Sequence, residues 1–326
     1  MTNDAHGNAV KSVFLDYATV SHHDLDPSAL QRALPGLVLH DVSRDDQIAE
    51  RIAGCEVVLL NKLQLTRALM QANPQLKLIA LAATGTNNVD LVAARELGIA
   101  VCNIRDYCTP SVAQHVLGVI LALTHRYADY SRLAIERWQR SPQFTMIDYP
   151  VRELRGRVLG VVGWGVLGQS AARACELGLG MQVMVANRQG GERVAGRLDL
   201  HELLPQVDVL TLHCPLTPAT TGMIGARELA LMKPDALIVN TARGALIDVQ
   251  ALADALRAGR LGGAAIDVLP QEPPVDGSPL FARDLPNLLL TPHTAWAARE
   301  SRQRAIDQMA ENVADYYAGG RLRRVA

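Results

Sequence analysis

Three residues in the second half of the sequence have the types needed to reduce a carbonyl group that lies next to a carboxylate. They are Arg243 in NTARGALID, Glu272 in QEPP and His293 in TPHTAW. An arginine can bind a carboxylate through two parallel hydrogen bonds. A histidine can protonate a carbonyl oxygen as hydride arrives, and a nearby carboxylate can fix its tautomer. Taken singly, the three could equally be a surface cation, a loop acid and a hydrogen-bonded histidine beside a proline.

Each of the three residues follows a short apolar run that is typical of a β-strand. Ligands of doubly wound parallel sheets bind at the carboxyl ends of the strands, so the three side chains are expected at one edge of one sheet. That shared edge favours the catalytic interpretation. Amphipathic segments at 166–178, 226–232 and 248–258 predict helices between the strands. The six predicted strands are 158–162, 182–186, 208–212, 236–240, 263–267 and 287–290.

The first of these strands runs directly into a G-x-G-x-x-G motif, and a helix is predicted to follow. In a dinucleotide-binding turn the first glycine makes the tight bend and the second lets the backbone approach a pyrophosphate. The third glycine packs the helix on the strand, and the helix N-terminus offers free N–H groups to the phosphates. A glycine-rich packing turn of another α/β protein is the alternative. The motif comprises Gly163, Trp164, Gly165, Val166, Leu167 and Gly168.

The next predicted strand should end in an acidic residue if the ribose hydroxyls of NAD are to be bound. The sequence has Asn187 there, followed by Arg188. An uncharged residue beside an arginine tolerates a 2′-phosphate, so the pattern favours NADP(H) over NAD(H). The alternative is a solvated Arg188, with the adenosine held by other contacts.

The first third of the chain has its own alternation of strands and helices, which predicts a separate small doubly wound domain. Between the two strand series, 111–140 contains no proline and reads as one long helix opened by Thr109-Pro110-Ser111. This helix would be a connector, a dimer arm, or both. A helix over 295–317, ended by Gly319-Gly320, could return to the first domain. The strands predicted in the first third are 12–16, 37–41, 56–60, 77–81 and 99–102, and the helices are 27–34, 44–53 and 89–97.

Composition excludes several classes of function. With 32 Lys+Arg against 33 Asp+Glu and 4% aromatic residues, the chain has neither the charge nor the stacking groups for nucleic acid. The apolar run 116–123 is far shorter than the roughly 20 residues that span a bilayer. The N-terminal stretch lacks a signal core, and the five cysteines form no CxxC pair. We therefore expect a cytoplasmic protein with no metal site and no membrane partner.

The motifs together resemble the D-isomer-specific 2-hydroxyacid dehydrogenase family over nearly the whole chain, and within it the glycerate dehydrogenase (hydroxypyruvate reductase) branch. The shared segments occur in the family's order and spacing. The branch is indicated by the opening FLDYATV, by ATGTNNVD and YCTPSVAQH, and by Trp296 after HTA. The segments shared with the family are GWGVLG, HCPLTPATTGMI, LMKPDALIVNTARGALID, GGAAIDVLPQEPP and TPHTAW.

The resemblance implies a Rossmann cofactor domain (105–293, with the 111–140 arm) inserted into a flavodoxin-like substrate domain (1–104 and 294–326), and a homodimer built through the arm. It makes Arg243, Glu272 and His293 the catalytic set, with His293 as the acid/base. Backbone N–H groups around Thr84 and Gly85, with Arg243, would hold the substrate carboxylate. The residue at position 187 departs from the family's acidic selector. Besides Asn187 and Arg188, the implied cofactor contacts are Val112, the 163–168 turn, Cys214, Pro215, Thr241, Ala242, Asp267 and His293.

These observations predict hydride transfer between NAD(P)H and a small 2-keto acid, with hydroxypyruvate/D-glycerate and glyoxylate first. Two alternatives stay open at this point. The same chemistry could act on another acid, such as pyruvate to D-lactate, or the fold could serve a dinucleotide-sensing regulatory protein. The complete Arg243, Glu272 and His293 set argues against a sensor, which needs no proton donor.

Overall fold

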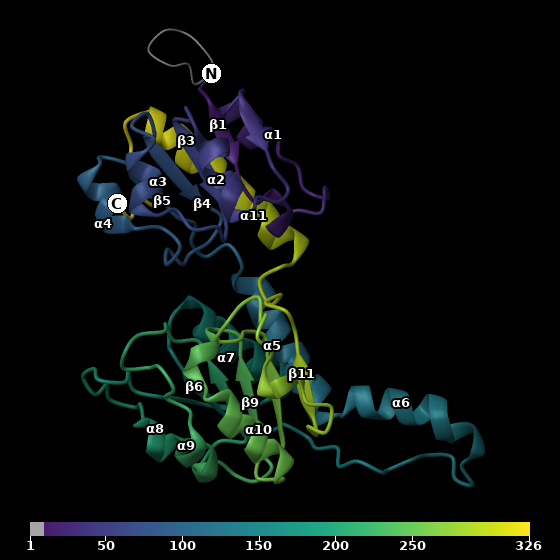
Figure 1. The fold of residues 1–326 in the computed structure, drawn as a ribbon. Coiled ribbons are helices and arrows are strands. Elements are labelled where there is room, and N and C mark those ends of the chain that lie inside the picture. The colour runs from purple at the N-terminus through teal and green to yellow at the C-terminus, as the bar shows by residue number, and fades with distance from the viewer. Residues whose placement is uncertain (1–9) are drawn as a thin grey trace. The chain divides into compact units, whose positions relative to one another are not determined.

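The computed structural model describes residues 10–326, and the chain divides into two compact units (Figure 1). Unit 1 consists of Met1–Cys108 and Ala297–Ala326, and unit 2, Thr109–Trp296, is inserted between these segments. The start of the N-terminal stretch in which we expected no signal sequence, residues 1–9, lies outside the described residues. Each unit contains one parallel sheet with helices, which confirms the predicted class of two doubly wound α/β domains.

Unit 1 is built on a five-stranded parallel sheet in the order β2-β1-β3-β4-β5. All residues of β3 and β4 are buried, as is typical of central strands covered on both faces. The strands are β1 (Ser12–Phe14), β2 (Leu37–Leu39), β3 (Val57–Leu60), β4 (Leu78–Leu81) and β5 (Ala100–Cys102). The helices are η1 (Tyr17–Thr19), α1 (Ser28–Ala33), α2 (Asp45–Ile52), α3 (Arg67–Gln71), α4 (Leu91–Glu96) and α11 (Arg299–Tyr317).

Three helices of unit 1 differ from the sequence prediction, and one of them is the short η1, which was not predicted. The short helix α3 was not predicted; it begins where the Thr66 side chain accepts a hydrogen bond from the Leu69 N–H. Helix α11 begins at Arg299 rather than at Ala295, because residues 291–295 are held in a loop by Asp267. Ile306, Met309 and Val313 on α11 are fully buried, so this C-terminal helix is part of the core of unit 1.

Unit 2 is built on a six-stranded parallel sheet in the order β11-β10-β9-β8-β6-β7. Strand β6 pairs with both β7 and β8, so the chain order reverses beside it and the glycine turn lies at the switch point. The strands are β6 (Val158–Val162), β7 (Gln182–Val185), β8 (Val209–Leu212), β9 (Leu237–Asn240), β10 (Gly263–Ile266) and β11 (Leu288–Leu290). The helices are α5 (Thr109–Thr124), α6 (Tyr127–Arg137), η2 (Trp138–Arg140), α7 (Val166–Leu179), α8 (Leu200–Leu203), α9 (Ala226–Leu231), η3 (Gly244–Leu246), α10 (Val249–Arg257) and η4 (Pro279–Phe281).

The single helix expected over 111–140 is wrong, because the chain breaks between α5 and α6. Arg126 takes a left-handed backbone conformation with φ 55°, which an α-helix cannot continue through. Its Nε donates to Asp129 Oδ2 at 2.7 Å, and its guanidinium carbon lies 5.0 Å from the centre of the Tyr149 ring. Helix α5 packs on α7, whereas α6 and the loop after it extend away from the sheet of unit 2 (Figure 1). The arm is therefore α6 with its following loop.

Within residues 10–326, no helix is long and apolar enough to cross a membrane. The same part of the chain holds no group of three or more His, Cys, Asp or Glu side chains that could bind a metal ion. All five cysteines are free thiols; Cys108 and Cys214 are half-buried and the other three are buried.

Candidate active site

The turn after β9 carries Arg243 and is fixed by the buried residue that ends the strand. Asn240 Nδ2 donates to the Arg243 carbonyl oxygen at 2.9 Å, and Asn240 Oδ1 accepts from the Ala242 N–H at 3.0 Å. A Cβ on Gly244 would lie 2.0 Å from the Leu269 carbonyl carbon, so only glycine lets this turn pack against the loop after β10. Arg243 itself is exposed, which leaves its guanidinium accessible.

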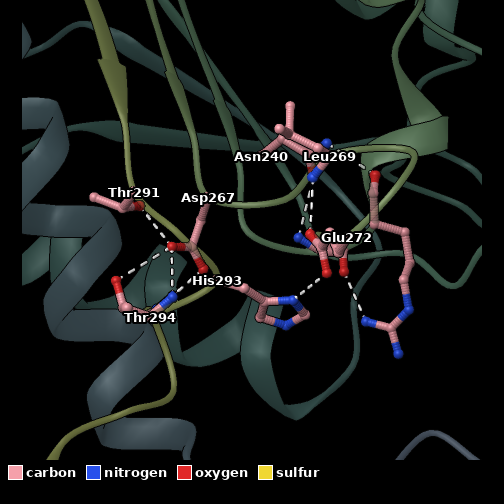
Figure 2. A network of polar contacts seen from close by, with 10 residues as sticks. Asn240, Asp267, Leu269, Glu272, Thr291, His293 and Thr294 are labelled. Carbon is pink, nitrogen blue, oxygen red and sulfur yellow. Dashed lines mark hydrogen bonds and ion pairs between the residues drawn. The ribbon is translucent and has the colours of Figure 1, made fainter. Parts of the chain in front are cut away.

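The loops after β10 and β11 bring Glu272 and His293 together (Figure 2). His293 Nδ1 lies 2.6 Å from Glu272 Oε2, and the two side chains are 28% and 35% exposed. Glu272 Oε1 accepts from the Leu269 N–H at 2.8 Å, which fixes the orientation of the carboxylate. Because an ionised carboxylate can only accept hydrogen bonds, Nδ1 is the ring nitrogen that carries the proton. Nε2 makes no hydrogen bond to any residue in the described part of the chain, so it is the nitrogen available for chemistry.

The loop that carries His293 is held by Asp267, at the carboxyl end of β10. Asp267 Oδ1 accepts from the Thr291 hydroxyl at 2.5 Å and from the Thr294 N–H at 2.8 Å, and Oδ2 accepts from the Ala295 N–H at 3.0 Å. His293 has φ 56°, a conformation that is uncommon for residues other than glycine. Its N–H donates to the Asp267 carbonyl oxygen at 2.8 Å. This network (Figure 2) stabilises the conformation that directs the ring toward Glu272.

Sequence reasoning missed most of the residues that support this site. Asn240 and Thr291 had no assigned role in the sequence analysis.

 The Leu269 N–H that fixes Glu272 is a main-chain group, and a side-chain pattern gives no sign of it. The position of Asn240 at the very end of a strand that leads into a candidate arginine was the one available signal. His115 on α5 was read only as part of a motif; burial lowers its pKa, against the opposing charge of Asp267.

The glycine turn after β6 has the geometry that a dinucleotide requires. Gly163 has φ 99°, and a Cβ there would lie 2.5 Å from the His213 carbonyl carbon. A Cβ on Gly168 would lie 2.0 Å from the Gly163 carbonyl oxygen, so helix α7 can begin this close to the turn only with glycine. Nothing lies within 4 Å of the corresponding position on Gly165, so the turn is open at the start of α7. These residues fit a pyrophosphate held by main-chain N–H groups.

His213, the first residue after β8, contacts the glycine turn. Its main chain lies against the backbone of Gly163, and its Nε2 lies 3.0 Å from the Thr211 hydroxyl oxygen. Burial lowers the pKa of His213 to about 4, so the ring is neutral near pH 7. The half-buried Cys214 and Pro215 come next along the same loop, and Thr241 and Ala242 follow β9. Val112, by contrast, is buried on α5.

The side chain of Asn187 is bound within the loop that follows β7. Its Oδ1 accepts from the Val194 N–H at 3.0 Å, and its Nδ2 donates to Asp199 Oδ1 at 3.1 Å. Arg193 also pairs with Asp199. Arg188 is exposed, and its guanidinium makes no hydrogen bond or ion pair to any of residues 10–326. Asn187 therefore shapes the loop, while Arg188 is the accessible cation.

Thr84 and Gly85 belong to unit 1, in the loop that follows β4. Gly85 is half-buried and Thr84 is exposed. Neither main-chain N–H donates to another group within the described residues, so both donors are available to a ligand. Such adjacent free N–H groups suit the oxygens of a carboxylate.

Comparison with known proteins agrees with this geometry. Residues 117–295 match the family model described as D-isomer specific 2-hydroxyacid dehydrogenase, NAD binding domain. The chain is 45% identical to a glycerate dehydrogenase of Methylorubrum extorquens over 276 residues, which cover 84% of this chain and 86% of the relative. It is 33% identical to a hydroxypyruvate reductase of Blautia hydrogenotrophica over 318 residues, covering 95% and 98% of the two chains.

A solved structure with the same fold is the NADPH-dependent glyoxylate/hydroxypyruvate reductase of Sinorhizobium meliloti, in complex with NADP and malonate. Its TM-score is 0.80 at 26% identity, and the match covers 98% of this chain and 97% of that one. The fold and these relatives define an oxidoreductase that uses a nicotinamide dinucleotide. The chain belongs to the D-isomer specific 2-hydroxyacid dehydrogenase family, whose members interconvert 2-hydroxy and 2-keto acids.

The close packing at the glycine turn predicts a position-specific effect of a single methyl group. Gly168→Ala should weaken dinucleotide binding by roughly ten-fold or more, because the new Cβ forces the Gly163 carbonyl away from the start of α7. Gly178→Ala is the matched control, since it lies on the same helix with nothing within 4 Å of the added carbon. Titration of the cofactor by its fluorescence measures both. Equal affinities in the two variants would contradict the role of the turn.

Proposed function

We propose that the protein reduces small 2-keto acids, hydroxypyruvate and glyoxylate above all, to the corresponding D-glycerate and glycolate. The observation that carries the proposal is the hydrogen bond between Glu272 and His293, which leaves Nε2 as a proton donor at a strand end of unit 2. The relatives named glycerate dehydrogenase and hydroxypyruvate reductase support this choice of substrate.

His293 is the acid in reduction and the base in oxidation. When bound, the nicotinamide supplies or accepts the hydride at the substrate carbon. Nε2 donates its proton to the carbonyl oxygen, which becomes the hydroxyl of the product. This requires the doubly protonated ring, and the carboxylate of Glu272, 2.6 Å from Nδ1, stabilises that cation. In the reverse direction the neutral ring takes the hydroxyl proton through Nε2.

The substrate carboxylate needs cationic or N–H donors. The exposed guanidinium of Arg243 can provide two parallel hydrogen bonds, and its turn is fixed by Asn240. Within unit 1, the free N–H groups of Thr84 and Gly85 are likewise suited to bind carboxylate oxygens. Within unit 2, we assign the cofactor contacts to the 163–168 turn and the loops after β7, β8 and β9.

The first test is a panel of 2-keto acids with NADH and NADPH. The family's chemistry predicts turnover of hydroxypyruvate and glyoxylate, with pyruvate and bulkier acids slower. Turnover of none of these acids would contradict the proposed function and favour a protein that only binds dinucleotides.

The same assay tests the histidine–glutamate pair. His293→Ala should lower turnover by roughly 10²–10⁴-fold with little change in cofactor affinity, because the imidazole acts on the substrate proton. Glu272→Gln should also lower turnover, since an amide no longer pairs with the protonated ring at Nδ1. Cofactor titration is the control. A His293→Ala variant with normal turnover would remove this residue from the mechanism.

For the cofactor we propose that NADPH is used at least as well as NADH. The support is the uncharged Asn187 with the accessible Arg188 beside it, and the NADP complex of the Sinorhizobium meliloti relative is consistent with it. An aspartate at position 187 would be a poor test, because its carboxylate would lie close to Asp199 and disturb the loop.

Arg188→Ala is therefore the cleaner substitution. It should raise the KM for NADPH by roughly ten-fold, because a charge-assisted contact to the 2′-phosphate is lost, and it should leave the KM for NADH nearly unchanged. Arg173→Ala, an exposed arginine on α7, controls for the loss of one surface charge. An enzyme that strongly prefers NADH before any substitution would overturn the proposal.

We also propose a homodimer that buries the arm. Ile135 is 84% exposed and Phe144 is 90% exposed, and Trp138 nearby is also exposed. Large apolar side chains gathered on one extension are typical of an interface. Leu133 on the same helix is buried within the chain and does not belong to this exposed surface.

Sedimentation at micromolar concentration should show a dimer, and Ile135→Glu should shift it toward monomer by placing a charge in the apolar contact. Leu177→Glu is the control, because this exposed leucine lies on α7, outside the arm. A wild-type monomer would contradict the dimer.

The location we propose is the cytoplasm. Two of the five free thiols, Cys108 and Cys214, are half-buried rather than buried, which suits a reducing compartment.

A further inference from the structure

We propose that Asn103 is a positioning residue that directs the N–H groups of Thr84 and Gly85 toward the substrate carboxylate. The inference rests on the proposed function, because it concerns how unit 1 prepares the carboxylate site. Asn103 follows β5, the strand next to β4, and the loop with Thr84 follows β4. All residues of the argument lie within unit 1.

The carbonyl groups of this loop are held by residues 103 and 104. Asn103 Nδ2 donates to the Thr84 carbonyl oxygen at 2.9 Å, and the Ile104 N–H donates to the Ala83 carbonyl oxygen at 3.2 Å. The Thr84 hydroxyl donates in turn to the Ile104 carbonyl oxygen at 2.9 Å. The two segments are thus joined by three hydrogen bonds.

These contacts determine where the free donors point. In a trans peptide the C=O of one residue and the N–H of the next point in opposite directions. Holding the Ala83 carbonyl therefore turns the Thr84 N–H away from residue 104, and holding the Thr84 carbonyl turns the Gly85 N–H away from Asn103. The two peptide groups fixed in this way are the two whose N–H groups have no acceptor among the described residues.

Asn103 is itself held on both sides of its main chain. Its N–H donates to the Arg323 carbonyl oxygen at 3.1 Å, and its carbonyl accepts from Asn312 Nδ2 at 2.9 Å. Arg323 Nη1 donates to Asn312 Oδ1 at 3.0 Å. Helix α11 and the C-terminal turn therefore fix the residue from which the amide reaches Thr84.

Of the two polar groups in the Asn103 side chain, only the Nδ2 donor makes a hydrogen bond within residues 10–326. Asn103 is 5% exposed, and its Oδ1 is buried with no hydrogen-bond partner among residues 10–326. A buried acceptor without a partner is unfavourable, so a purely structural position would be better filled by an apolar side chain. The role of the amide is therefore its hydrogen bond to the Thr84 carbonyl oxygen.

The test compares Asn103→Ala with Asn73→Ala. Asn73 is also 5% exposed in unit 1, and its Nδ2 also donates to a main-chain carbonyl, that of Leu69, at 2.8 Å. Asn103→Ala should raise the KM for hydroxypyruvate and the inhibition constant of malonate by roughly ten-fold each, with a smaller change in kcat. The dissociation constant for NADPH should stay the same. Asn73→Ala should change thermal stability but none of these constants.

A second variant keeps the proposal testable if Asn103→Ala does not fold. Thr84→Val removes the hydroxyl contact to Ile104 on an exposed loop and should also raise the KM, and Thr84→Ser should restore it. An unchanged KM in Asn103→Ala, or in Thr84→Val, overturns the positioning role. Equal losses in KM, kcat and NADPH affinity also overturn it, because they indicate general damage. A wild-type protein that reduces no 2-keto acid contradicts the proposed function itself.

Discussion

The hydrogen bond of 2.6 Å between Glu272 and His293 sets strict demands on unit 2. The two residues are far apart in the chain and come from loops after neighbouring strands, so the pairing of β10 with β11 must have one register. The buried carboxylate of Asp267 then holds the loop of His293, and the Leu269 N–H holds the carboxylate of Glu272. A buried side-chain carboxylate thus positions His293, and a main-chain N–H positions Glu272.

Close approach of backbone to backbone is the second constraint. The 163–168 turn passes so near the loop after β8 that a single Cβ on Gly163 or Gly168 would overlap main-chain atoms. Gly244 has the same role where the turn of Arg243 meets the loop after β10. Glycine at these positions brings the strand ends together, and the cost in chain entropy is offset by the buried core of unit 2.

Unit 1 also offers main-chain N–H donors to a ligand, although the loop after β4 that carries them is not a glycine-rich turn. The N–H groups of Thr84 and Gly85 are free because residues 103 and 104 bind the carbonyls next to them. The C-terminal helix α11 joins the core of unit 1 through Ile306, Met309 and Val313. The last residues of the chain thereby support a loop that lies more than 200 positions earlier, between β4 and α4.

The sequence by itself determined the order and type of nearly all strands, the glycine turn and the strand ends that carry Arg243, Glu272 and His293, because apolar periodicity and glycine spacing are local patterns. It did not predict the break at Arg126, which depends on contacts to Asp129 and to the distant Tyr149. Only the tertiary structure showed that Asn187 binds its own loop, that Leu133 is buried and that Asn103 reaches Thr84. Each of these depends on partners brought together by folding, and a pattern read along the chain contains no information about which distant groups will meet.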